Sequence, residues 1–201
     1  MANDSSQHGY ITPLANPAPL EDEAFENFLE AIICGITGMD QSLVRPRWQP
    51  EPPNQPDRET DWIAFGIMRQ TADAYSFNEH IGGLMDGSDN VQRHEDVEIL
   101  LSSYGPNGSR NLGWFRDGLL VDQNRDALTE QGMGQTSTGE IVTAPALIKG
   151  MWYRRFDMQW RIKRQIRRSY AILTLLTANG ILYTQGSANT IETPLLVQQP
   201  S

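Results

Sequence analysis

The sequence contains one cysteine and no long apolar run. Cys34 cannot form a disulfide within its own chain, and its apolar neighbours in AIICGI favour a packed thiol over a nucleophile. No stretch approaches the roughly 18 to 20 consecutive apolar residues that a membrane-spanning helix requires. The first residues, MANDSSQHGYITP, lack the basic and apolar regions of a signal peptide. We therefore expect a soluble protein of a reducing compartment, with no membrane partner.

Patterns typical of catalysis or metal binding are also scarce. His80 and His94 have carboxylates beside them but lack the spacing of a helical metal site. The DGSDN segment (86–90) lacks the glycine and glutamate that complete a calcium loop, and GMGQTS (132–137) lacks the lysine of a phosphate-binding loop. The sequence therefore predicts a protein that is not an enzyme, with no catalytic, cofactor-binding or metal-binding residues and no cofactor.

Positive charge is sparse and unevenly distributed. The chain has 16 Lys and Arg against 25 Asp and Glu, a formal net charge of −9. This surplus of acids disfavours general affinity for nucleic acid, because such affinity depends on neutralising phosphates. Seven of the 16 basic residues nevertheless fall in WYRRFDMQWRIKRQIRRSY (152–170). Any function of positive charge must therefore be local.

Two helical regions are predicted by apolar periodicity. From Leu20 the apolar residues recur at helical spacing, acids occupy the first turn, and Gly35 or Gly38 ends the helix. A second helix follows YGPNGS (104–109) and continues as a broken piece through NRDALTEQ (124–131), before Gly132 ends it. These segments supply the two or three helices of the expected fold.

Strands are predicted at DWIAFGIMR (61–69) and VQRHEDVEILLSSY (91–104), with DGSDN as a hairpin connection before the second. The prolines of VRPRWQPEPPNQP (44–56) predict a stiff surface strap excluded from the sheet interior, which Trp48 and Trp62 could fix to the core. GMGQTSTGEIVTAP (132–145) reads as a loop or short hairpin. A further turn is expected at Asn179-Gly180.

The basic stretch has a period of two. Seven of its ten even-numbered positions are apolar or aromatic, starting with Trp152, whereas Tyr153 is the single such residue among the odd positions. The pattern predicts a long strand with one buried face. Its exposed odd face, which we call the basic strip, carries Arg155, Arg161, Lys163 and Arg167.

The order of these elements indicates an α+β fold, with a mainly antiparallel sheet packed against two or three helices. Residues 1–19 are punctuated by three prolines and predict a flexible N-terminal arm. Residues 20–185 are expected to form a single α+β domain. Residues 186–201 are expected to form a C-terminal arm.

The basic strip allows three interpretations: a nucleic-acid site, a solvated strand face without a partner, or a protein interface. Its aromatic neighbours lie on the opposite parity, which weakens base stacking. Acids that could complement it in another copy cluster on the first helix; they are Glu21, Asp22, Glu23, Glu26 and Glu30. In the C-terminal arm, Leu195, Leu196 and Val197 could hold a neighbouring subunit or fold back on their own domain.

Five segments together resemble the neck terminator, or tail terminator, family of long-tailed phages. They are GITG (35–38), LVRPRWQPEPPNQP (43–56), RHEDVEILLSSYGPN (93–107), RDGLLVDQNRDAL (116–128) and WYRRFDMQWRIKRQIRRSYAIL (152–173). The resemblance covers about residues 20 to 176. The segment 82–90 and the tail after Gln185 follow no pattern of that family.

The resemblance implies a structural virion protein that assembles as a ring, a hexamer, between the head connector and the tail tube. Its implied partners are further copies of itself, the tail tube and sheath proteins, and the connector or adaptor proteins, with DNA only in transit through the lumen. Its implied location is the virion neck or tail, and the host cytoplasm during assembly. The alternatives are a baseplate or tail-completion ring of the same fold, and a DNA-binding accessory protein that uses the basic strand.

Overall fold

The computed structural model describes residues 10–14, 19–49, 51, 54–82, 86–173, 177–185 and 190–198. These residues form two compact units. The helical unit consists of Pro19–Ser76 and Arg93–Ile166, and the strand unit combines Phe77–Gln92 with described residues of 1–18 and 167–201. The domain boundaries expected at 19/20 and 185/186 stay a prediction.

Three α-helices in the helical unit confirm the periodicity analysis. Helix α1 spans Asp22–Thr37, α2 spans Gly108–Gly118 and α3 spans Asp122–Glu130. Helix α1 ends at Gly38, whose φ of 69° is the left-handed conformation that glycine adopts without strain, and whose N–H donates to the Cys34 carbonyl (2.8 Å). A short 3-10 helix follows at Gln41–Leu43.

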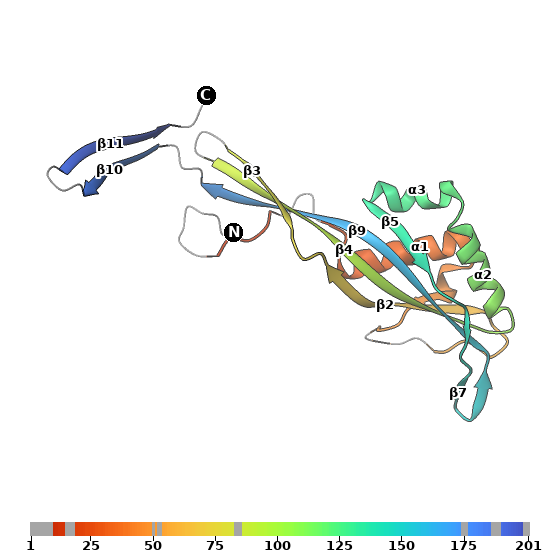
Figure 1. The fold of residues 1–201 in the computed structure, drawn as a ribbon. Coiled ribbons are helices and arrows are strands. Elements are labelled where there is room, and N and C mark those ends of the chain that lie inside the picture. Colours follow the sequence, from red (N-terminus) through yellow and green to blue (C-terminus); the bar gives the residue numbers. More distant parts are fainter. Residues whose placement is uncertain are drawn as a thin grey trace. The chain divides into compact units, whose positions relative to one another are not determined.

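A seven-stranded sheet accompanies the helices (Figure 1). Its main path is β1 (Val44–Pro46), β2 (Trp62–Ala72), β4 (Asp86–Tyr104), β9 (Arg155–Leu173) and β5 (Met133–Thr138). Strand β3 (Phe77–Ile81) pairs with β4, and β6 (Val142–Thr143) pairs with β9. Strand β1 is parallel to β2, whereas β4 pairs antiparallel with β2 and β3, and β9 pairs antiparallel with β5 and β6, which confirms the α+β prediction.

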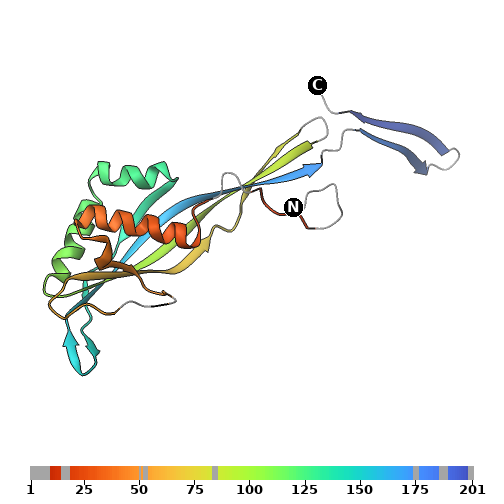
Figure 2. The ribbon, with the colours of Figure 1, turned by 180° about the vertical axis from the view of Figure 1, so that it is seen from behind.

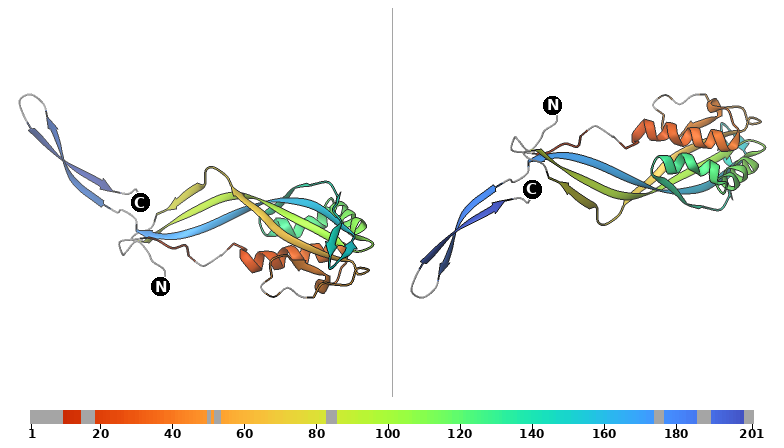
Figure 3. Two further views of the ribbon diagram at one scale, coloured as in Figure 1. Left: turned by 90° about the horizontal axis from the view of Figure 1, so that it is seen from below. Right: turned by 90° about the horizontal axis from the view of Figure 1, so that it is seen from above.

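The core of the helical unit lies between the sheet and the three helices (Figure 2). Strands β2, β4 and β9 direct alternate residues toward α1, α2 and α3, as the period of a strand requires. Trp160 of β9 is fully buried there and meets Phe115 of α2 edge-to-face, with ring centroids 5.1 Å apart. We call this side of the sheet the helix-covered face and the opposite side the open face (Figure 3).

The proline-rich strap begins as an edge strand. Val44–Pro46 pair with Ile63–Phe65, and the Arg47 N–H continues the pattern by donating to the Phe65 carbonyl (2.8 Å). This agrees with the exclusion of prolines from a sheet interior, although the sequence analysis missed the strand. Trp48 is 62% exposed, and its ring lies against Gly66 of β2, so close that a Cβ added at that glycine would come within 2.8 Å of it. Trp62 stacks on Tyr104 (4.1 Å).

Two predicted turns are wrong. The DGSDN segment is the start of β4, where Asp89 pairs with His80 of β3. Asn179-Gly180 lies inside β10 (Thr177–Gln185), which pairs with β11 (Thr190–Gln198) in a separate two-stranded sheet. The physical reason is the same at both places: backbone pairing fixes the strand, and turn-forming side chains do not prevent it when the partner strand is present.

The basic stretch forms two strands. Strand β8 (Met151–Tyr153) pairs with β7 (Ala146–Ile148) in a small hairpin, and β9 starts after Arg154. The even positions from Met158 to Ile166 are buried as predicted. The prediction for Trp152 is wrong, because the break at Arg154 reverses the parity and leaves Trp152 64% exposed.

Candidate protein-interaction site

The basic strip is largely neutralised within its own chain. Arg155 makes two hydrogen bonds to Asp157 (2.8 and 2.7 Å), and Arg161 Nη2 lies 2.5 Å from Glu98 Oε1 of β4. Within the strand unit, Arg167 donates to the side-chain oxygen of Gln92 (3.1 Å). Lys163 is exposed and has no ion pair in the described part of the chain. The strip therefore offers less free positive charge than its sequence predicts.

Charges of both signs meet on the open face. Glu98 lies between Arg161 and Arg69, whose Nε is 4.0 Å from its carboxylate. Together with Thr136 and Asp96, these residues line a shallow cavity of about 330 Å³. Exposed ion pairs of this kind contribute little to stability. Their value to a partner is the pattern of charge that they present.

A second polar network joins the strap to the open face. Arg47 donates to the Ser102 hydroxyl, and that hydroxyl donates to Asp157, which also holds Arg155. Burial is the main cause that lowers the pKa of the Arg47 guanidinium, whereas the hydrogen bond to Asp157 is the main cause that raises the pKa of Arg155. The network therefore connects β1, β4 and β9 through their side chains.

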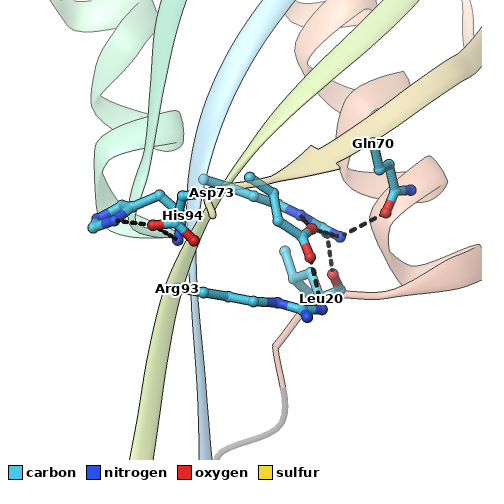
Figure 4. A network of polar contacts seen from close by, with 7 residues as sticks. Leu20, Gln70, Asp73, Arg93 and His94 are labelled. Carbon is cyan, nitrogen blue, oxygen red and sulfur yellow. Dashed lines mark hydrogen bonds and ion pairs between the residues drawn. The ribbon is translucent and has the colours of Figure 1, made fainter. Parts of the chain in front are cut away.

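A buried ion pair that the sequence analysis missed lies on the helix-covered face (Figure 4). Arg164 Nε and Nη2 donate to Glu95 Oε2 (3.0 and 2.9 Å), and both side chains are more than nine-tenths buried. The guanidinium also donates to the Leu20 carbonyl (2.8 Å) and to Gln70 (3.1 Å), and it lies over the Phe25 ring (4.4 Å). This pair thus connects β9 and β4 to the start of α1 and the end of β2.

The pair has neighbours that complete its charge balance. Arg93 Nη2 contacts the other Glu95 oxygen (2.8 Å), so one carboxylate serves two guanidinium groups. His94, a residue considered above as a metal ligand, is instead hydrogen-bonded to Asp73. The His94 N–H donates to Asp73 Oδ2 (3.2 Å), and the Asp73 N–H donates to the His94 carbonyl (2.9 Å). The available sequence signal was an arginine at position 164, on an even face that is otherwise apolar from Phe156 to Ile166.

The acidic residues of α1 divide into two sets. Glu21 is the N-cap and Asp22 opens the first turn. The other three, Glu23, Glu26 and Glu30, line a groove of about 620 Å³ between α1 and the β1 segment. Arg45, Pro46 and Trp48 line its other side, together with Val44. We call this the α1 groove.

Two of the groove carboxylates have unusual surroundings. Burial, followed by repulsion from Asp22 and Glu23, raises the pKa of Glu26. Glu30 is only 8% exposed, yet it has no hydrogen bond or ion pair among the described residues. The Glu30 oxygens are not among the fully buried, unpaired polar atoms of the described residues, so its carboxylate opens onto the groove that the residue lines.

The apolar residues of the C-terminal arm are part of β11. Leu195, Leu196 and Val197 pair through the backbone with Gly180, Asn179 and Ala178 of β10. The backbone of this tail is therefore paired with another strand of the same chain. That these three residues hold a neighbouring subunit stays a prediction.

No helix among the described residues is long and apolar enough to span a membrane, and no group of three or more candidate ligands within those residues could hold a metal ion. A comparison with known families finds a match to the model described as "Phage neck terminator protein" over residues 23–187. No curated protein matches the chain.

Proposed function

The chain belongs to the phage neck terminator family, a family of structural proteins, and on this premise we propose that it forms a ring that terminates the tail tube and joins it to the head connector. The proposed partners are further copies of the chain in a hexamer, the tail tube and sheath proteins, and the connector or adaptor proteins. Assembly would take place in the host cytoplasm, and DNA would pass through the lumen.

The observation that carries the proposal is the separation of unpaired charge on one chain. Three carboxylates line the α1 groove, and one of them, Glu30, has no hydrogen bond or ion pair in the described part of the structure. The cations that could complement them, including Lys163 of the basic strip, lie on other elements. Complementary patches at different places favour head-to-tail contacts, which close into a ring when the rotation between copies permits.

Passage of DNA without strong binding is favoured over a DNA-binding role. The net charge of −9 repels phosphate, and Arg155 and Arg161 already have acidic partners within the chain. Trp160 is fully buried and therefore offers no surface on which bases could stack. A salt-dependent gel shift tests this choice: we expect no shift of DNA at moderate ionic strength, and a clear shift would support the accessory-protein alternative.

Assembly is the direct test of the proposed function. Light scattering and negative-stain images of the purified chain, alone and mixed with tail tube and connector proteins, should reveal rings. Monomers under all of these conditions would contradict the proposal.

A further inference from the structure

The α1 groove is built to receive a cation. Glu30 has no partner within the described residues and its carboxylate opens onto the groove, and Glu23 and Glu26 approach the same space from the preceding turns of α1. Among the described residues, Arg45 is the one positive side chain that lines the groove, and its guanidinium donates to the carbonyls of Ser42 (2.8 Å) and Asn54 (3.0 Å) instead. The groove therefore has three carboxylates and no cation engaged with them among the described residues.

The other side of the groove is apolar. Val44, Pro46 and the exposed ring of Trp48 line it. An aromatic ring next to carboxylates suits a lysine or arginine side chain, because the ring attracts the cation and packs against its aliphatic stem. The geometry thus selects a basic residue carried on an apolar segment.

The β7–β8 hairpin has this composition. Its strands are joined by the two-residue loop Lys149-Gly150, and Lys149 is exposed, with no ion pair in the described part of the chain. Leu147, Met151 and Trp152 on its two strands are 59%, 49% and 64% exposed. The hairpin therefore presents one lysine among apolar side chains that its own chain leaves uncovered.

The backbone at the tip is unfavourable for lysine. Both loop residues have positive φ, 49° for Lys149 and 78° for Gly150, as a type I′ turn requires. Asn, Asp and Gly occupy the first position of such a turn more readily than lysine does. A lysine at this place is thus better explained by what its side chain contacts than by the turn.

We propose that the β7–β8 hairpin of one copy docks into the α1 groove of a second copy, with Lys149 among Glu23, Glu26 and Glu30. The contact is heterologous, since the groove and the hairpin are different surfaces of the chain, and such contacts generate rings. This inference rests on the proposed function, because it requires self-assembly. To the proposed ring, this inference adds the two surfaces that meet, the hairpin and the α1 groove, and the residue that joins them, Lys149.

Carbodiimide cross-linking of the wild-type protein tests the contact directly. This reagent joins a lysine to a carboxylate that it touches, and Lys149 and Lys163 are the two lysines of the chain. In assembled protein made from equal parts of ¹⁴N- and ¹⁵N-labelled chains, mixed-isotope peptides identify links between copies. We expect Lys149 linked to Glu23, Glu26 or Glu30. Links between copies that contain Lys163 but not Lys149 would overturn the hairpin contact while leaving the proposed ring in place.

Two substitutions give a second test, because each is expected to leave folding intact while weakening association. Lys149→Asn suits the positive φ of the turn, and Glu30→Gln removes one of three neighbouring negative charges, so neither should lower the melting temperature of the isolated chain. Each should nevertheless weaken self-association about tenfold in sedimentation velocity, because each removes one partner of a desolvated charge contact. Lys149→Arg is the matched control, which keeps the charge and should associate like the wild type.

Failure of the inference and failure of the proposed function are distinguishable. Wild-type rings together with unchanged association of both Lys149→Asn and Glu30→Gln would reject the hairpin contact alone. A wild-type chain that stays monomeric even with tail tube and connector proteins would contradict both.

Discussion

In the helical unit, the same strands carry buried apolar side chains on one face of the sheet and charged side chains on the other. Toward the helices, β2, β4 and β9 direct residues such as Phe65, Ile99 and Trp160, all fully buried. On the open face, β2, β4 and β9 present Arg69, Glu98 and Arg161, linked across the strands. The first face holds most of the core. The second carries a smaller buried cluster of Ala64, Tyr104 and Tyr153 and, apart from it, a charge pattern whose contribution to stability is small. Most of the core and the exposed charges are therefore separated by the alternation of a β-strand.

The strand unit gives a second contrast. In the strand unit, no side chain whose exposure the structure describes is buried. The core formed by the described residues lies entirely in the helical unit. Phe77 and Ile81 of β3 are 63% and 48% exposed. A few strands without a buried face are marginal in water, so this unit is expected to depend on partners more than the helical unit does.

The largest expected effect on stability is that of Trp160→Ala. The side chain is fully buried on the helix-covered face against Phe115, so its removal should cost about 3 to 5 kcal/mol of unfolding free energy. Chemical denaturation of the isolated chain measures this. A loss below about 1 kcal/mol would mean that this face is not packed as described.

Breaking the buried ion pair should be nearly as costly. Glu95→Ala leaves the Arg164 guanidinium buried without its carboxylate, and we expect a loss of about 3 kcal/mol. This is the lower end of the usual range, because Arg164 keeps its bonds to Leu20 and Gln70. The double variant Glu95→Leu with Arg164→Met is the control and should recover much of the loss. A double variant no more stable than Glu95→Ala would contradict this interpretation.

Reversing the exposed charges should change stability far less than assembly. Arg161→Glu, Lys163→Glu and Arg167→Glu together are expected to cost at most about 1 kcal/mol of unfolding free energy, because all three side chains are exposed. Attachment to partners, measured as the yield of virions, should fall. An unchanged yield of virions would indicate that the basic strip is a solvated strand face without a partner.

Glu26→Gln tests the crowding of carboxylates in the α1 groove. Because the pKa of Glu26 is raised in the folded chain, its ionisation lowers stability as pH rises through that value. At pH 7 Glu26→Gln should therefore be more stable than the wild type, by about 0.5 kcal/mol from the like charges of Asp22 and Glu23. The difference should vanish at acidic pH, below about 4, where the carboxylate is protonated in both states. Glu23, Glu30 and Arg45 also line this groove, so the comparison requires the two proteins side by side at each pH.

The smallest expected effect on folding is that of deleting residues 187–201, which removes β11 with Leu195, Leu196 and Val197. If this segment holds a neighbouring subunit, the isolated chain should melt at the wild-type temperature and fail to assemble. Thermal melting and light scattering on the same sample measure both. A lower melting temperature, or normal assembly, would contradict the prediction.

The sequence predicts those parts of the molecule in which side-chain periodicity and burial agree. The core face of β9 from Met158 to Ile166 and the first helix follow from spacing, whereas the choice of Gly38 over Gly35 as the helix end is made by the structure. The early start of β4 could not be predicted, since DGSDN has turn-forming residues and its pairing with β3 depends on a distant segment.

The site was less predictable than the fold, because charge in the sequence does not reveal which charges are already paired. Arg161 appears free until Glu98 of β4 is placed beside it, and the partner of Arg164, an arginine on the apolar parity, is found only when Glu95 is placed. Conversely, Glu30 gains its importance from its place in the α1 groove without a partner among the described residues, which no pattern in the chain indicates.

The most direct test of the central claim is an image of the virion in which this chain is located, by antibody labelling or by density at the resolution of secondary structure. The account predicts a closed ring of this chain between the head connector and the head-proximal end of the tail tube. Finding the chain at the baseplate, or absent from the purified virion, would contradict it.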